Sequence, residues 1–176
     1  MHMHHNIRFT AHAAILAAMY FALTHLQNLL LPGSASWAIQ CRLSEALCIF
    51  ALMTPAAIPG LTIGCLLFNL SFSGALPLDF LVGSLATLLA CGSMWLLRGV
   101  TIKGYPLMAM IMPALFNALF VGWELTVYIG DTIFTGPAFM LNAAYVAAGE
   151  LLVLLIPGTV LYYALKSRHL DRKLFQ

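Results

Sequence analysis

The chain consists of long apolar runs separated by short polar stretches. The first run extends from Thr10 to Leu31, and Pro32 and Gly33 follow it directly. A run of about 20 apolar residues is long enough to cross the ~30 Å hydrocarbon core of a bilayer as a helix. Because proline and glycine end helices, the pattern predicts a first membrane-spanning helix over residues 10–31.

Five further apolar runs follow the first. They predict spans at about residues 41–53, 57–72, 79–97, 106–128 and 138–165. Asp79 stands where its side chain could cap the fourth helix. We therefore expect an all-α integral membrane protein, a six-transmembrane-helix bundle occupying residues 9–166. A flexible segment (1–8) precedes this domain, and a basic cytoplasmic tail (167–176) follows it.

Basic residues outside the spans predict the orientation of this bundle. With six spans, Arg8, the turn at 98–103 and the tail all fall on one side. Lysine and arginine are enriched in cytoplasmic loops. Both termini are therefore expected in the cytoplasm, with Asp79 and Asp131 on the opposite side.

Composition supports a lipid environment and excludes several functions. Of 176 residues, 62% are hydrophobic and 8% are charged, whereas soluble domains have about 25% charged residues. A net charge of +2 is too small to suggest nucleic-acid binding. The four cysteines form no CxxC pair and are expected to pack as small residues, and the His-rich start is expected to be a flexible end. We find no phosphate-binding loop, HExxH motif or nucleophile elbow, so we expect no enzyme, metal or cofactor.

Four ionisable residues fall inside the predicted spans: Arg42, Glu45, Glu124 and Glu150. Each costs about 2.5–3.5 kcal/mol on insertion scales, so each needs a partner or a polar cavity. Arg42 and Glu45, three residues apart on a helix, could form a structural ion pair. Glu124 and Glu150 have no basic residue at helical spacing. They are either protonated, matched to a cationic or donor-rich ligand, or share Arg42.

Other polar and aromatic residues are expected in the same layer. They could hydrogen-bond a polar heterocycle and stack on it, or form an interfacial aromatic belt and interhelical hydrogen bonds. These residues are Trp37, Gln40, Asn69, Asn117, Trp123, Tyr128, Asn142 and Tyr145. The first span also has small residues about four apart, which would let another helix approach closely; they are Ala13, Ala14, Ala17, Ala18 and Ala22.

The sequence resembles the QueT family, the substrate-binding S components of energy-coupling factor (ECF) vitamin transporters. The most specific matching motif is Gln-x-Arg-x-Ser-Glu-Ala at residues 40–46. The resemblance extends over about residues 8–165, and its other motifs are residues 17–24, 55–61 with Gly64 and Asn69, 79–88, 113–118 with Gly122 and Glu124, and 149–150.

The resemblance implies a six-helix S component in the bacterial plasma membrane. It would bind a queuosine precursor, a deazaguanine such as queuine or its aminomethyl relative. Its partners would be a coupling transmembrane protein, packed on Ala14 and Ala18, and two ATPases. We hypothesise that Glu124 or Glu150 accepts the guanine-like edge, and that Glu45 or the other carboxylate accepts the amine. Arg42, Gln40 and Asn69 would orient these groups.

Three alternatives stay open from the sequence. The chain could be an S component for another vitamin-like heterocycle. It could instead be a self-sufficient channel or secondary transporter, which would need no ATPase. It could also be a structural subunit, in which the ionisable residues would form only packing ion pairs.

Overall fold

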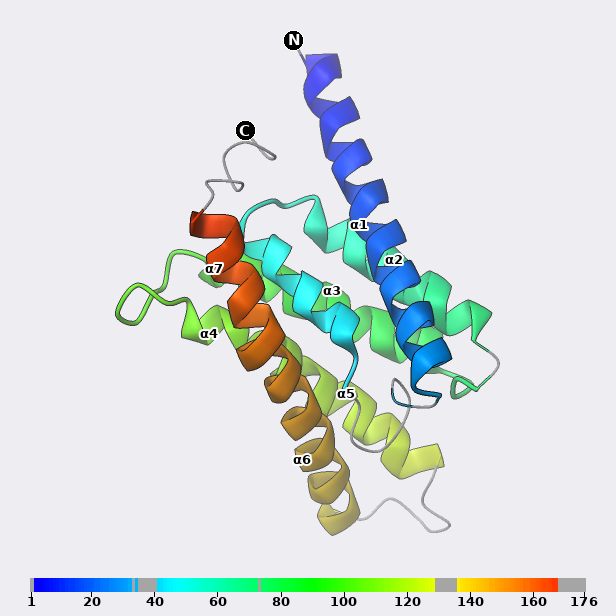
Figure 1. Ribbon diagram of the computed structural model, residues 1–176. Helices are drawn as coiled ribbons and strands as arrows, with labels where there is room; N and C mark the ends of the chain where they lie inside the picture. Colours follow the sequence, from blue (N-terminus) through cyan, green and yellow to red (C-terminus); the bar gives the residue numbers. More distant parts are fainter. Residues whose placement is uncertain (1, 33, 35–40, 73, 129–135, 168–176) are drawn as a thin grey trace.

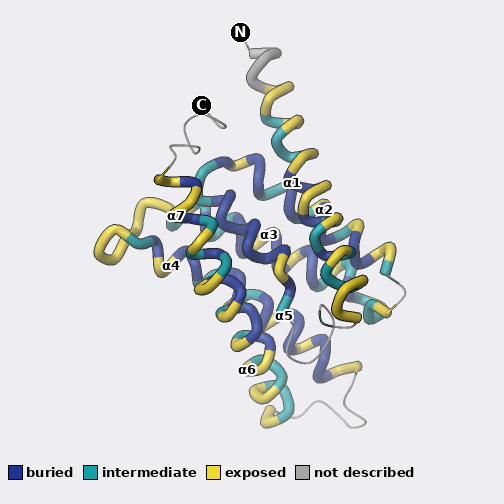
Figure 2. The backbone as a smooth tube through the Cα atoms, viewed as in Figure 1, coloured by how far each residue is buried: buried dark blue, intermediate teal, exposed yellow. Residues whose placement is uncertain are grey.

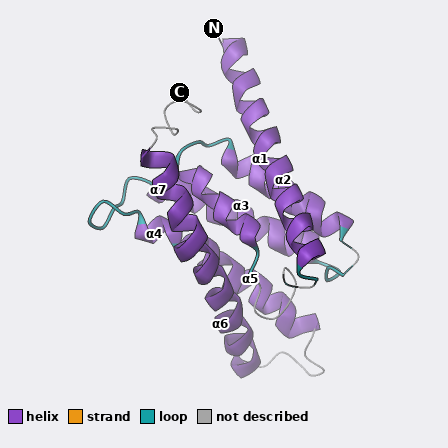
Figure 3. Ribbon diagram, viewed as in Figure 1, coloured by secondary structure: helices purple, strands orange, loops and turns teal. Residues whose placement is uncertain are grey.

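The computed structural model describes residues 2–32, 34, 41–72, 74–128 and 136–167, and every regular element within them is a helix (Figures 1 and 3). Two of these elements are not α-helical: η1 is a 3-10 helix and η2 is a π-helical turn. In chain order the elements are α1 (His2–Leu30), η1 (Leu43–Leu52), α2 (Ala57–Ser71), α3 (Asp79–Leu97), α4 (Leu107–Met110), α5 (Met112–Tyr128), α6 (Gly136–Val153), η2 (Leu154–Gly158) and α7 (Thr159–Ser167).

Each predicted span coincides with helical structure, and the all-helical class is confirmed. The fifth span consists of α4 and α5, and the sixth of α6, η2 and α7. Four segments are long and apolar enough to cross a membrane: Asn6–Leu30, Asp79–Leu97, Leu107–Tyr128 and Gly136–Ser167. The apolar helices η1 and α2 have 10 and 15 residues, about 20 Å and 22 Å at their ordinary rises. Six crossings and cytoplasmic termini stay predictions.

The structure describes nearly all of the N-terminal segment but not most of the C-terminal tail. Helix α1 begins at His2, so it includes most of the segment 1–8 that we separated from the membrane domain. Residues 168–176, most of the predicted basic tail, lie outside the described residues.

Helix η1 is the central element of the fold. It contacts α1, α2, α3, α6, η2 and α7, and all its residues from Ser44 to Ala51 are buried (Figure 2). Side chains three residues apart line up along a 3-10 helix, so Glu45 and Cys48 lie on the same side of η1. This central position brings the polar residues of the 40–46 motif into the interior.

Helices α1 and α2 pack in direct backbone contact. A Cβ atom at Gly60 would lie 2.6 Å from the carbonyl oxygen of Ala13, and one at Gly64 would lie 2.7 Å from that of Ala17. Both distances are too short for a real Cβ atom. The two glycines, four residues apart, therefore allow a small-residue contact between the helices.

We expect Gly64→Ala to destabilise the protein by about 1–3 kcal/mol, because the added methyl group overpacks this contact. It would also meet the Cβ atom of Tyr20 at 2.8 Å. Thermal unfolding in detergent measures the effect. Gly92→Ala on α3 is the matched control, since a Cβ there meets nothing within 4 Å. Equal melting temperatures for the two variants would contradict the close packing.

Candidate ligand-binding site

Seven polar side chains form a cluster inside the helix bundle, which we call the buried polar cluster. They come from η1 and the residue before it, α2, α3, α5 and α6, and none is more than 5% exposed. Its members are Arg42, Glu45, Asn69, Asp79, Asn117, Glu124 and Glu150. Arg42 interacts electrostatically with all four carboxyl groups of this cluster, those of Glu45, Asp79, Glu124 and Glu150.

Arg42 extends from the end of the preceding loop into the contact between α2 and α3. Its backbone is extended (φ −74°, ψ 102°), and its guanidinium lies 3.4 Å from Oδ2 of Asp79 and 5.8 Å from the ring centre of Phe68. The sequence suggested an ion pair between Arg42 and Glu45. In the structure, the ion pair of Arg42 is with Asp79. Helical spacing does not apply to Arg42 and Glu45, because Arg42 precedes the helix.

Asp79 has a different role from the helix cap that we predicted. The capping position of α3 is Leu78, with no side-chain hydrogen bond to the helix, and Asp79 is the first helical residue. Its side chain is directed inward, where it is 5% exposed and pairs with Arg42. Asn69 donates from Nδ2 to the main-chain oxygen of Asp79 at 2.9 Å. Gly83 permits this arrangement, because a Cβ there would lie 2.9 Å from Asn69 Nδ2.

Glu45 has hydrogen-bond partners on both oxygens. The hydroxyl of Tyr20 on α1 donates to Oε1 at 2.5 Å, and the thiol of Cys48 donates to Oε2 at 3.3 Å. We did not select Tyr20 from the sequence. The available signal was its spacing from Ala13 and Ala17, which places all three on one face of α1.

The remaining acceptors of the cluster are unsatisfied. Within the described residues, the buried side-chain atoms without a hydrogen-bond partner are all acceptor oxygens. They are Oε1 and Oε2 of Glu124, Oε2 of Glu150, Oδ1 of Asp79 and Oδ1 of Asn69. The other side of the Glu150 carboxyl is hydrogen-bonded by Asn117. A buried polar atom without a partner costs free energy, so this set of oxygens is suited to a ligand with several N–H donors.

Not all residues proposed from the sequence join the cluster. Trp37 and Gln40 lie outside the described residues. Trp123 and Tyr145 are 42% and 41% exposed and face outward. The reason is helix rotation: successive residues turn by about 100°, so Trp123 points away from the interior when Glu124 points into it. Asn142 is half-buried and donates to Oγ1 of Thr126 at 3.0 Å.

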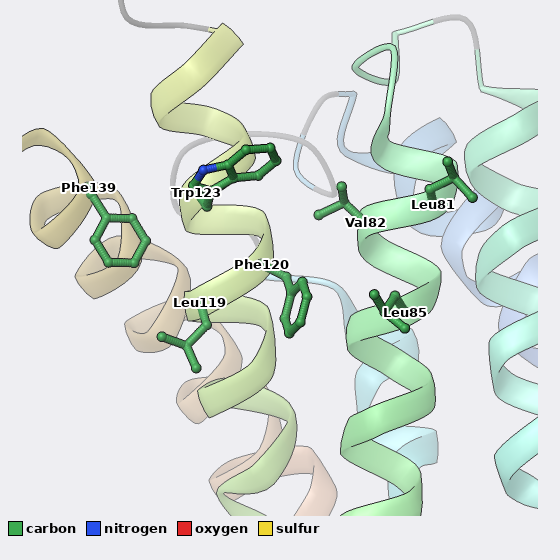
Figure 4. A pocket seen from close by; sticks show the side chains of 7 residues that line it. All are labelled: Leu81, Val82, Leu85, Leu119, Phe120, Trp123 and Phe139. Atoms are coloured by element: carbon green, nitrogen blue, oxygen red, sulfur yellow. The ribbon is translucent and has the colours of Figure 1, made fainter. Parts of the chain in front are cut away.

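Two apolar grooves lie on the outside of the bundle, and neither is lined by the cluster. The first, of about 730 Å³, runs between α3 and α5 (Figure 4). Its lining residues are Leu81, Val82, Leu85, Leu119, Phe120, Trp123 and Phe139. The second, of about 800 Å³, follows α1 and α2, and its lining includes Ala13, Ala14, Ala17 and Ala18.

The small residues of α1 divide between its two faces. Ala13 and Ala17 pack on the glycines of α2, whereas Ala14, Ala18 and Ala22 are exposed. Of these five alanines, the second group is the more exposed. We call Ala14, Ala18 and Ala22 the outer face of α1.

Several long apolar helices around a buried polar cluster define a helical membrane protein with a polar interior. The family model named QueT transporter matches residues 10–167. The chain therefore belongs to the QueT transporter family, and the resemblance drawn from the sequence motifs is confirmed. No curated protein matches the chain, and no solved structure matches it.

Proposed function

We propose that this protein is the S component of an ECF-type importer in the bacterial plasma membrane. It binds a queuosine precursor, a deazaguanine such as queuine or its aminomethyl relative, from outside the cell. The observation that supports this most directly is the set of unpartnered acceptor oxygens on Glu124, Glu150, Asp79 and Asn69. Membership of a transporter family supports a binding role rather than a purely structural one.

The chemistry of such a ligand is complementary to these oxygens. A guanine-like edge presents a ring N–H and an amino group side by side, and a carboxylate accepts both in a bidentate pair. Glu124 is the best candidate: within the described residues neither of its oxygens has a hydrogen bond of good geometry, and its nearest donor is the backbone amide of Leu78. The amine of an aminomethyl precursor is cationic and suits Glu150 Oε2 or Asp79 Oδ1. Glu45 is less available, because its oxygens accept from Tyr20 and Cys48.

A tryptophan fluorescence titration of the purified protein tests this function. Queuine, its aminomethyl precursor, guanine and an unrelated vitamin are compared, with Trp123, next to Glu124 in the chain, as one reporter. A saturable response to a deazaguanine alone supports the proposal. Selective response to another heterocycle would favour an S component of different specificity. Uptake by the protein alone in liposomes would favour a self-sufficient transporter.

The outer face of α1 is the proposed docking surface for the coupling protein, which would connect this chain to two ATPases. It combines small residues with an adjoining apolar groove of about 800 Å³, which would allow a partner helix to approach closely. The sequence itself has no phosphate-binding loop, so an ATP-driven importer needs ATPases supplied by other chains.

We expect Ala18→Leu to abolish uptake by the assembled transporter while leaving ligand affinity unchanged, because Ala18 is exposed whereas every member of the buried polar cluster is buried. Ala17→Leu is the contrasting variant. Ala17 is 8% exposed and touches Gly64, so this change should lower the melting temperature as well. Uptake assays with the coupling module, alongside titration and thermal unfolding, separate the two effects. Normal uptake by Ala18→Leu would contradict the docking surface.

A further inference from the structure

The inner face of α1 carries three polar side chains that hold the segment before and at the start of η1. Tyr20, Thr24 and Gln27 stand at i, i+4 and i+7, so they follow one another along one side of the helix. Tyr20 and Thr24 are fully buried. We call these three residues the α1 ladder.

Each member of the α1 ladder makes a contact with residues 41–45. The Tyr20 hydroxyl donates to Glu45 Oε1 at 2.5 Å. The hydroxyls of Thr24 and Ser44 are hydrogen-bonded at 2.7 Å. Gln27 donates from Nε2 to the carbonyl oxygen of residue 41 at 2.5 Å, and its Oε1 accepts from the amide of residue 43 at 2.7 Å.

The segment held in this way carries two members of the buried polar cluster. Arg42 lies between the two main-chain groups that Gln27 holds, and Glu45 accepts directly from Tyr20. Arg42 then reaches Asp79 on α3 at 3.4 Å. A chain of polar contacts therefore runs from α1 through residues 41–45 to Asp79, whose other oxygen, Oδ1, is unsatisfied.

The α1 ladder and the outer face of α1 lie on opposite sides of the same helix. At about 100° per residue, Ala18 lies roughly 160° from Tyr20 around the helix axis. The residues that hold Arg42 and Glu45 therefore lie on the side of α1 opposite its exposed alanines.

We propose that Tyr20, Thr24 and Gln27 are positioning residues for the ligand site: they fix the main chain on both sides of Arg42 and the carboxyl group of Glu45. This inference rests on the proposed function. It predicts that loss of one of these hydrogen bonds loosens residues 41–45 and weakens ligand binding, because Arg42 and Glu45 are members of the buried polar cluster.

The test removes the hydroxyl group of one α1 ladder residue at a time with little change in side-chain volume. Thr24→Val is compared with Thr62→Val on α2. The Thr62 hydroxyl donates to the carbonyl oxygen of Ile58 in its own helix at 2.7 Å, as the Thr24 hydroxyl does to that of Tyr20. A second pair compares Tyr20→Phe with Tyr162→Phe, since the Tyr162 hydroxyl accepts from Lys166 Nζ at 3.2 Å rather than donating to a member of the cluster. Hydrogen–deuterium exchange of residues 41–52 is measured without ligand, and ligand dissociation is measured by titration and stopped flow.

We expect exchange in residues 41–52 and ligand dissociation to be about tenfold faster in Thr24→Val and Tyr20→Phe than in their controls, the effect of one lost hydrogen bond. Unchanged exchange and dissociation in both would overturn the α1 ladder. So would a fall in melting temperature with unchanged dissociation, which indicates a merely structural role. If the unaltered protein binds no deazaguanine, the proposed function fails, while the exchange measurement still decides whether the ladder holds this segment.

Discussion

Glu124→Gln is expected to lower deazaguanine affinity about 100-fold and to stabilise the ligand-free protein. The affinity falls because an amide accepts on only one atom and loses the charge-assisted hydrogen bonds, which contribute about 1.5–3 kcal/mol each. The ligand-free protein gains stability because the change removes a buried carboxyl group whose oxygens have no hydrogen bond of good geometry within the described residues. Titration and thermal unfolding of the same preparation measure both changes.

Glu45→Gln is the matched control, with the same chemical change at a satisfied carboxyl. Its oxygens accept from Tyr20 and Cys48, so the amide must turn an N–H group toward one donor. The ligand-free protein should then lose stability, opposite in sign to Glu124→Gln. If both variants change stability in the same direction, or if Glu124→Gln binds normally, Glu124 is not the ligand acceptor that we propose.

The positions of the helices could be predicted because each helix coincides with a long run of apolar residues in the sequence. The fourth predicted span, expected to be capped by Asp79 and to reach about Leu97, ends where α3 (Asp79–Leu97) ends, and the 57–72 span differs from α2 by one residue. The type of helix at 43–52 could not be predicted. Long 3-10 helices are uncommon, and the short apolar run there gives no signal that separates them from α-helices.

The candidate site could be predicted only in part, because it depends on helix rotation. Ionisable residues in apolar runs identified Arg42, Glu45, Glu124 and Glu150, and the structure brings all four into one buried cluster. Aromatic residues gave no such signal. Trp123 is exposed, and its type suits a membrane interface as well as a binding site.

Residues missed from the sequence are those whose role depends on distant partners. Asp79 follows a turn, where an acidic residue ordinarily caps a helix, and only the proximity of Arg42 shows its role. Tyr20 lies in an apolar run and looks like any buried aromatic residue. Its hydrogen bond to Glu45 joins positions 25 residues apart in the chain, which local sequence patterns do not encode.

Arg42→Met is expected to destabilise the protein more than any other single change in the cluster. Removing one partner of a buried ion pair costs about 3–5 kcal/mol, since the other charge stays buried. Here Arg42 interacts with Asp79 and also with Glu45, and with Glu124 and Glu150. Loss of the guanidinium therefore leaves several carboxyl groups without a compensating cation. Thermal unfolding in detergent without ligand measures the effect.

Asp79→Leu provides the contrast, because the remaining carboxyl groups still face Arg42 after Asp79 is removed. Its cost should be clearly smaller than that of Arg42→Met. In the double variant, part of the stability lost by Arg42→Met should return, since the directly paired charge at 3.4 Å is gone as well, but ligand binding should not return. Strict additivity of the two single changes would show that the pair is not coupled. If the double variant regains stability and also binds the ligand normally, Arg42 does not orient the groups that the ligand contacts.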